Sequence, residues 1–221
     1  RYFNNFDAFM KLVLSMTGGF YNTLIIFFFT LLFSLPLGLL IAFGRMSKNR
    51  IVSGIFRLYI SLMRGTPLML QLMVVYFGPF YLFGMNIGKW RFPAIITGFA
   101  LNYGAYFAEI YRSGIQSMPI GQYEAAQILG YTKAQTFFKI ILPQVIKRIL
   151  PSITNEVITL VKDTSLSFTL SVAEMFTIAK ALAASQTNMI PFVAAGIFYY
   201  VFNLIVAVVM EWIEKKLDYY R

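Results

Sequence analysis

The chain has 221 residues, of which 58% are hydrophobic and only 13% are charged, and its mean hydropathy is +0.67. Soluble domains carry about 25% charged residues, so the composition disfavours a water-soluble fold and predicts an integral membrane protein. The net charge of +10 is expected to face lipid headgroups rather than nucleic acid in a chain this apolar. The sequence contains no Cys and no His, which excludes disulfides, thiolate nucleophiles, His-based acid/base catalysis and the usual zinc sites.

Five stretches are long and apolar enough to cross the roughly 30 Å hydrocarbon core, which takes about 20 helical residues. In chain order they are residues 19–44, 65–83, 92–111, 150–170 and 191–210. The end of the fourth, residues 164–171, is too polar for lipid, which predicts a helix end or irregular backbone lining a cavity. The sequence therefore predicts an all-α integral membrane protein, with one transmembrane domain of five helices over residues 1–221.

Lys and Arg residues are distributed unequally between the two sides of these spans. Thirteen of them lie between spans one and two, between spans three and four, or after span five, whereas five lie on the opposite side. Cytoplasmic loops carry the excess of positive charge. The bias predicts an N-terminus outside, a C-terminus inside, and a cytoplasmic loop at about residues 114–143.

That loop has the pattern of two helices joined by a glycine. Pro119 and the helix formers after it predict a short helix that ends at Gly130. Thr132 can cap a second helix, which we expect Pro143 to end. Glycine permits a sharp reversal of the chain. An amphipathic interfacial hairpin without a partner is the alternative interpretation.

The same loop fits the pattern E-A-A-x3-G-x9-I-x-L-P, filled by Glu124, Ala125, Ala126, Gly130, Ile140, Leu142 and Pro143. Ala125 and Ala126 have no bulk, so we expect them to permit the close approach of a partner surface. The pattern resembles the EAA motif of the membrane subunits of bacterial ABC importers. The resemblance implies that these residues couple the chain to an ATPase through a cytoplasmic coupling helix between spans three and four.

The resemblance is closest to the permeases of polar amino-acid importers of the histidine, glutamine and arginine type, and it covers nearly the whole chain. The matching segments are Gly19-x3-Thr23-Leu24, Arg64-Gly65-Thr66-Pro67-Leu68, residues 105–115, Asn155-Glu156 and residues 160–166. A minor departure is Val157, where a Phe is more usual. The resemblance implies a type I importer fold that works with a second permease subunit, either identical or a paralogue. It also implies two ABC ATPase subunits and an extracytoplasmic amino-acid-binding protein.

Polar residues inside spans three and four predict a substrate site, because a charge in the bilayer costs at least ~2.5–3.5 kcal/mol. Glu156 and Asp163 share a helix face with Thr159 beside them, and Asn102 lies near the midplane of span three. We expect these four residues to bind the ammonium group of an amino acid, and a cationic side chain would add a second attraction. Alternatively, Lys162 neutralises Asp163 as a structural pair, and Asn102 joins helices.

Glu109 and Arg112 lie one helical turn apart near the end of span three, and we expect them to form a structural pair. The sequence has no P-loop. ATP and Mg²⁺ are therefore expected on a partner ATPase, with no cofactor and no catalysis in this chain.

Together these features predict a permease subunit of an ATP-driven importer in the prokaryotic cytoplasmic membrane. It would move polar amino acids, with basic ones (arginine, lysine or histidine) favoured, by alternating access. The membrane-buried charges also allow an ATP-independent secondary transporter or channel, and a scaffold or sensor subunit is a further alternative. A membrane enzyme is disfavoured because His and Cys are absent.

Overall fold

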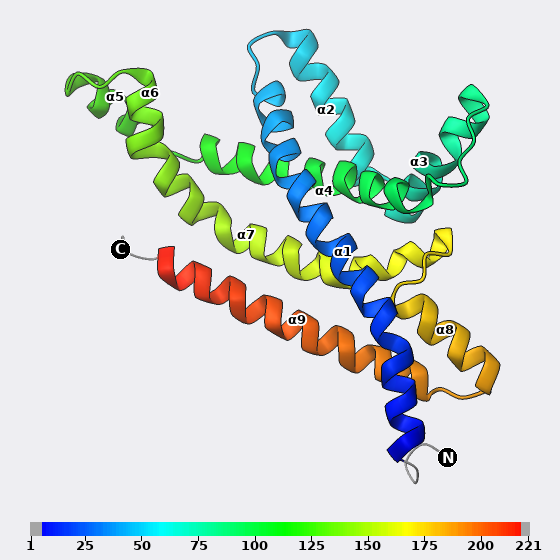
Figure 1. Cartoon of the computed structure of the whole chain (residues 1–221). Coiled ribbons are helices and arrows are strands. Elements are labelled where there is room, and N and C mark those ends of the chain that lie inside the picture. The colour runs from blue at the N-terminus through cyan, green and yellow to red at the C-terminus, as the bar shows by residue number, and fades with distance from the viewer. Residues whose placement is uncertain (1–5, 218–221) are drawn as a thin grey trace.

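The computed structural model of the chain describes residues 6–217, and every regular element within that range is helical (Figure 1). The elements are α1 (Phe6–Arg45), α2 (Arg50–Gly65), α3 (Leu68–Phe83), α4 (Arg91–Gln116), α5 (Ile120–Ile128), α6 (Lys133–Gln135), the π-helical η1 (Thr136–Ile141), α7 (Leu142–Asp163), the 3₁₀-helical η2 (Thr164–Leu170), α8 (Met175–Gln186) and α9 (Ile190–Leu217). The all-α prediction is confirmed. Helices α5 and α6 project at one end of the molecule, whereas α8 and the first turns of α1 lie at the opposite end.

Within residues 6–217, two helices are long and apolar enough to cross a membrane unaided, namely Met10–Arg45 within α1 and the whole of α9. The pair α2 and α3, bent by 114°, meets the same criteria only as a pair, and so does the run 133–170 with α8, bent by 58°. Helix α4 is not among them, although it contains the predicted third span. It lies against other helices along most of its length, so its buried face carries small and polar residues rather than lipid-facing ones. The helices support a multi-pass chain, and the count of five spans stays a prediction.

Helices α1 and α4 pack at backbone distance through small residues. A Cβ placed on Gly38 of α1 would lie 3.1 Å from the carbonyl oxygen of Gly104 and 3.1 Å from the amide nitrogen of Ala108, both on α4. Ala42, one turn beyond Gly38, is fully buried, as is Ala108. Small side chains one turn apart allow close helix contact inside a membrane, where apolar burial alone gives no attraction. The pairing places α4 at the centre of the bundle.

The predicted second span is only the second half of a broken helix. Residues 50–65, which the sequence placed in a loop, form the amphipathic helix α2, and α2 meets α3 at Thr66 and Pro67. The prediction failed because α2 carries its apolar side chains on one face. The exposed ones are Ile51, Ile55, Leu58 and Leu62, and the other positions make the segment too polar for a span.

Two amide side chains satisfy the carbonyl groups that this break leaves without helical partners. The Nε2 atom of Gln71 donates to the carbonyl oxygens of Met63 at 2.9 Å and Thr66 at 3.1 Å. The Nδ2 atom of Asn102 donates to the same Met63 oxygen at 3.1 Å and to the Oε1 atom of Gln71 at 2.9 Å. Backbone groups inside a membrane protein need such partners because water is absent. Since Asn102 is near the middle of α4, the break lies there too, and Arg64 lies beside it rather than in a separate loop.

Pro143 does not end a helix, contrary to our expectation. Helices α6, η1 and α7 form one continuous run from Lys133 to Asp163, and the predicted fourth span, residues 150–170, comprises the second half of this run together with η2. Proline lacks an N–H group, and its ring clashes with the carbonyl four residues earlier. The π-helical turn before it, in which the Leu142 N–H donates to the carbonyl of Phe137, widens the helix at this point. The helix therefore accommodates Pro143 and continues past it.

The polar segment after α7 has the irregular backbone that the sequence predicts. It forms the 3₁₀-helical η2 and ends at Ser171, whose φ of 55° is left-handed. The side chain of Glu174 then begins α8 by accepting hydrogen bonds from the backbone N–H groups of Phe176 and Thr177, both at 2.7 Å. The carboxylate is fully buried and also accepts from the Tyr199 hydroxyl of α9 at 2.8 Å. A single acid thus joins α8 to α9.

Helix α1 contacts the same junction through Gly19 and Thr23. The Thr23 hydroxyl accepts from the backbone N–H of Met175 at 3.3 Å. A Cβ on Gly19 would lie 3.0 Å from the carbonyl oxygen of Glu174. The spacing Gly19-x3-Thr23 therefore serves helix packing around the start of α8.

Candidate functional site

The first part of the candidate site is the loop that carries the E-A-A pattern. The predicted short helix is α5, and Pro119 precedes it at the N-cap position. At its end, the N–H of Gly130 donates to the carbonyl of Gln127 and the N–H of Tyr131 donates to that of Ala126, both at 3.0 Å. This pair of bonds is the Schellman arrangement, in which the residue after the C-cap is left-handed. Gly130 has a φ of +77°, and a Cβ there would meet no atom within 4 Å, so glycine is required by backbone conformation rather than by space.

The second helix of the loop begins with the cap predicted at Thr132. Its hydroxyl accepts from the N–H of Gln135 at 3.2 Å, and the Gln135 side chain accepts from the N–H of Thr132 at 2.9 Å. This reciprocal pair is a capping box. Because one helix is closed at Gly130 and the next is capped at Thr132, the loop is a stiff elbow.

The outer surface of α5 is apolar and exposed. Ile120, Ile128 and Leu129 are 74%, 86% and 73% exposed, and α5 projects beyond the ends of α7 and α9 (Figure 1). Exposed apolar surface of this kind is typical of a contact with another protein or with the membrane. Ala125 faces outward, as the predicted close approach of a partner requires, but Ala126 is only 1% exposed. The expectation for Ala126 is wrong in this respect, because its methyl group packs inside the chain.

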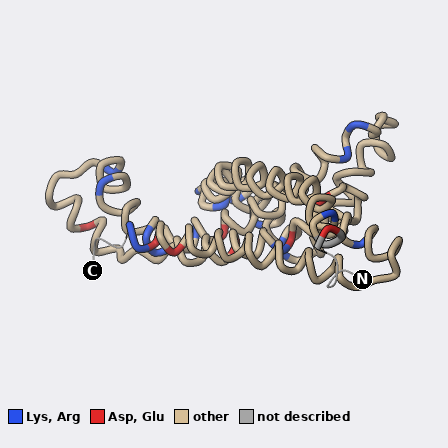
Figure 2. The backbone as a smooth tube through the Cα atoms, turned by 60° about the horizontal axis from the view of Figure 1, so that its bottom comes forward, with Lys and Arg blue, Asp and Glu red and all other residues tan. Residues whose placement is uncertain are grey.

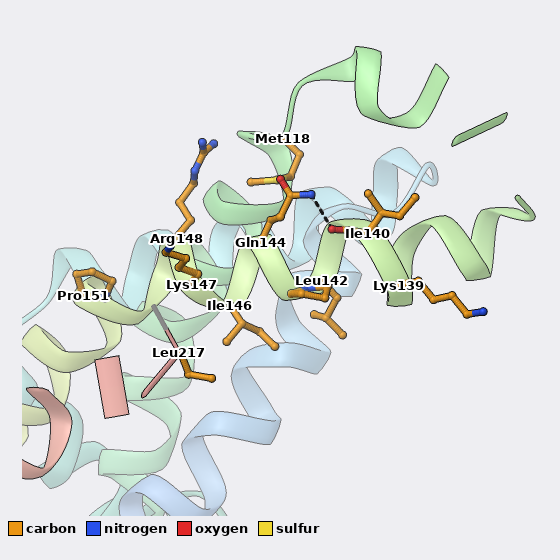
Figure 3. A pocket seen from close by; sticks show the side chains of 11 residues that line it. Met118, Lys139, Ile140, Leu142, Gln144, Ile146, Lys147, Arg148, Pro151 and Leu217 are labelled. Carbon is orange, nitrogen blue, oxygen red and sulfur yellow. Dashed lines mark hydrogen bonds between the residues drawn. The ribbon is translucent and has the colours of Figure 1, made fainter. Parts of the chain in front are cut away.

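Beside this elbow lies an open cleft of about 1070 Å³ (Figure 3). Leu142 and Pro143, at the end of the E-A-A pattern, line the cleft together with Lys139 and Ile140 before them and residues of the next turns of α7. Met118, ahead of α5, and Leu217, at the described end of α9, complete its walls. The E-A-A pattern therefore ends at a surface cleft between the elbow and the ends of α7 and α9.

Side-chain bonds fasten the elbow to α7. Gln122 of α5 and Gln144 of α7 exchange two hydrogen bonds of 2.9 and 2.8 Å. Arg148 of α7 donates to the carbonyl oxygen of Ser117 at 2.8 Å and to its hydroxyl at 2.9 Å, just before α5. These bonds tie α5 and the turn before it to α7, the helix that carries Glu156 and Asp163.

The second part of the candidate site is a cluster of charged and aromatic side chains between α2, α4 and α7. The buried Tyr103 donates from its hydroxyl to the Oδ2 atom of Asp163 at 2.8 Å. The Glu156 carboxylate is close enough to interact electrostatically with both Asp163 and Arg64. The Cζ atom of Arg64 lies 5.3 Å from the ring centroid of Tyr106, a cation–π distance. Charges of both signs occur among the packed helices as well as at their ends (Figure 2).

The structure thus brings Glu156 and Asp163 to one place, but it positions the other two predicted residues differently. Asn102 points to the break between α2 and α3, as the alternative of helix joining described, and Thr159 is exposed on α7. Lys162 is exposed and acts on Asp163 only electrostatically. Whether these residues contact a substrate stays a prediction.

Three members of the cluster were missed from the sequence, namely Arg64, Tyr103 and Tyr106. The two tyrosines are three residues apart in span three, a spacing that places them on neighbouring faces of one helix, and this was the available signal. Arg64 belongs to a segment that matches the family, but it was not assigned to the site because that segment was placed between two spans. The expected pair of Glu109 and Arg112 is confirmed, with the Arg112 Nε atom 3.1 Å from a Glu109 oxygen and a second contact alongside.

A helical membrane bundle with a projecting elbow, a broken helix and a partly buried charged cluster is the architecture expected of a membrane permease component. A model of the family described as the binding-protein-dependent transport system inner membrane component matches residues 34–219, and the chain belongs to that family. It is therefore a multi-pass protein of the cytoplasmic membrane that is not catalytic by itself.

Relatives of similar length support this assignment. The chain is 37% identical to the L-cystine transport system permease protein TcyB of Bacillus subtilis (strain 168), over 93% of the chain and 87% of the relative. It is 36% identical to the arginine transport system permease protein ArtQ of the same organism, over 96% and 97%. It is also 36% identical to the putative glutamine transport system permease protein GlnP of Rickettsia bellii (strain RML369-C), over 84% and 85%.

Solved structures agree with these relatives. The crystal structure of an amino acid ABC transporter with histidines has a chain that superposes with a TM-score of 0.86 at 32% identity, over 96% of this chain and 98% of that one. An inward-facing MetNI methionine ABC transporter superposes with a TM-score of 0.73 over 94% of this chain and 98% of that one. Its identity of 19% supports the fold alone.

Proposed function

We propose that this chain is the permease subunit of an ATP-driven importer of polar amino acids. The observation that carries the proposal is the stiff elbow of α5, Gly130 and α6, which presents an exposed apolar surface and is fastened to α7. The permeases named for cystine, arginine and glutamine transport support amino acids as the substrate class. Since the sequence has no P-loop, ATP and Mg²⁺ are bound by a partner ATPase.

The proposed assembly has two permease subunits, two ATPases and an extracytoplasmic binding protein. The N-terminus lies outside and the C-terminus inside, so that α5 meets the ATPase in the cytoplasm. In this arrangement α2 and α3 together form the second of five spans, with their break inside the membrane. The surface formed by Glu124, Ala125, Gly130, Leu142 and Pro143 is the ATPase contact, and Ala126 supports it from within.

Transport proceeds by alternating access. Closure of the two ATPases on ATP moves the elbows, and the bonds from Gln122 and Arg148 pass the movement to α7. Since Glu156 and Asp163 are on α7, the surroundings of the candidate substrate site change with the position of the elbow. The substrate must bind the outward-open and inward-open states with different affinity for the cycle to be driven in one direction.

The proposed substrates are the basic amino acids arginine, lysine and histidine. Glu156 and Asp163 supply two carboxylates in one cluster, which suits a ligand with an α-ammonium group and a second cation. Thr159 is proposed to contribute a polar contact as the helices move, whereas Asn102, bonded to Met63 and Gln71, is proposed to brace the helix break beside the site. Neutral amino acids such as glutamine are the competing substrates.

The decisive test is purification of the tagged chain in mild detergent with mass spectrometry of its partners, followed by uptake in proteoliposomes. We expect a P-loop ATPase to accompany the native chain and to be lost from the Gly130→Asp variant. Uptake of a basic amino acid should stop when ATP is removed. Uptake that survives without ATP but collapses with the proton or sodium gradient would overturn the proposal in favour of a secondary transporter.

A further inference from the structure

Arg64 lies in the last turn of α2, at the break between α2 and α3 and beside the middle of α4. Its neighbour Met63 is bonded through its carbonyl oxygen to Asn102, which fixes this end of α2 on α4. The Cζ atom of the Arg64 guanidinium group lies over the Tyr106 ring, 5.3 Å from the ring centroid. Among the described residues, none accepts a hydrogen bond from Arg64. The cation–π contact with the ring takes up none of the five N–H donors in a conventional hydrogen bond, so they remain available.

The carboxylates lie on the other side of the two tyrosines. The ring centroids of Tyr106 and Tyr103 are 6.2 Å apart, and the Tyr103 hydroxyl reaches Asp163 at 2.8 Å. Glu156 interacts electrostatically with both Asp163 and Arg64. Within one cluster, positive charge therefore lies at the α2 end and negative charge at the α7 end.

An α-amino acid carries an ammonium group and a carboxylate on the same carbon atom. A site that recognises this unit needs both signs of charge a short distance apart, and acidic residues alone would repel the carboxylate. Lys162 is the neighbour of Asp163 in sequence, but it lies on α7, the same helix as the two acids, so it is not across the cluster from them; Lys162 and Arg64 are both exposed. Arg64 is the cation that the fold places across the cluster from the two acids.

We propose that Arg64 binds the α-carboxylate of the transported amino acid. The inference rests on the proposed function, in which the substrate's ammonium group occupies the Glu156 and Asp163 side of the cluster. The planar guanidinium fork matches a carboxylate with two parallel hydrogen bonds, which a lysine cannot reproduce. Because the α-carboxylate is common to all amino acids, this contact makes Arg64 select amino acids over amines. Glu156 and Asp163 set the preference for cationic side chains.

The test compares an amino acid with its decarboxylated analogue. Equilibrium binding of arginine and of agmatine is measured on the purified permease–ATPase complex, without binding protein, for the native chain and for Arg64→Gln, Arg64→Lys and Arg57→Gln. Arg57 is the matched control, because it is an exposed arginine two turns earlier on α2. We expect Arg64→Gln to weaken arginine binding by about 10- to 100-fold, as removal of a charge-assisted hydrogen bond does. Agmatine binding should be unchanged, Arg64→Lys intermediate, and Arg57→Gln native-like.

The outcomes separate this inference from the proposed function. Equal losses for arginine and agmatine in Arg64→Gln would show a structural role and overturn the inference, and so would unchanged binding of both. Glu156→Gln and Asp163→Asn should weaken arginine and agmatine alike. If these two variants bind both ligands as the native chain does, or the native chain binds neither, the cluster is not the substrate site and the proposed site itself fails. Glutamine binding that also depends on Arg64 would retain the inference while removing the preference for basic substrates.

Discussion

The side-chain amide of Asn102 donates to the amide oxygen of Gln71 at 2.9 Å, and both amides donate to the carbonyl oxygen of Met63. One carbonyl at the end of α2 thus receives two hydrogen bonds, from α3 and from α4. The break between α2 and α3 is therefore an ordered part of the fold in which the freed backbone carbonyl groups are hydrogen-bonded. Arg64 owes its position beside α4 to this arrangement.

Asn102→Ala should destabilise the chain by about 1–3 kcal/mol, because it leaves the buried Gln71 amide with an unmet acceptor. The readout is thermal unfolding of the purified complex together with arginine affinity. A structural brace predicts lower stability with nearly native affinity in the folded fraction. Native stability with lost affinity would instead identify Asn102 as a substrate residue, as the sequence suggested.

The contact between α1 and α4 gives a second prediction. Gly38→Ala places a methyl group about 3.1 Å from backbone atoms of Gly104 and Ala108. The backbone cannot move aside as a flexible side chain can. We therefore expect the variant to lose about 1–3 kcal/mol of unfolding free energy, or to fail to accumulate in the membrane. Gly18→Ala on the same helix is the control, since its Cβ would meet no atom within 4 Å. Alanine favours helix over glycine there, so that variant should be as stable as the native chain or slightly more stable.

The buried carboxylate of Glu174, at the start of α8, gives a third prediction. All four partners of the Glu174 carboxylate are donors, namely the N–H groups of Phe176 and Thr177 and the hydroxyls of Thr177 and Tyr199. In Glu174→Gln one oxygen becomes an NH₂ group that cannot accept, so donors face donors. We expect Glu174→Gln to lower the free energy of unfolding by at least about 2 kcal/mol. Tyr199→Phe should lower it less, by about 1 kcal/mol.

Thermal unfolding of the native chain, Glu174→Gln and Tyr199→Phe measures these losses of stability. Glu211→Gln serves as the matched control, because Glu211 is exposed and pairs with Lys215 on the surface of α9. Its stability should stay native. A Glu174→Gln variant as stable as that control would show that the junction between α8 and α9 does not depend on the carboxylate.

Sequence reasoning recovered the parts that depend on local signals. Gly130 and Thr132 are terminal signals of neighbouring helices, and both have the predicted roles. It failed where tertiary contacts decide, as for α2, whose amphipathic pattern makes sense only beside α4, and for Pro143, which a π-helical turn accommodates. The clustering of Glu156 and Asp163 follows from their spacing on α7. The approach of Arg64 from another helix could not be predicted, because it depends on the angle at which α2 and α3 meet.

Gly130 allows a final prediction that separates backbone conformation from bulk. Its φ of +77° is left-handed, and a Cβ would meet no neighbour, so Gly130→Ala costs about 1–2 kcal/mol from strain alone. Asn tolerates this conformation better than Ala does. We therefore expect transport per bound ATPase to fall in the order native, Gly130→Asn, Gly130→Ala, measured as ATP-driven uptake in proteoliposomes with ATPase content quantified. Gly121→Ala, in the first turn of α5 with open space around its Cβ, should transport as the native chain does. If Gly130→Asn and Gly130→Ala are equally impaired, contact with the ATPase rather than the left-handed turn sets the requirement for glycine.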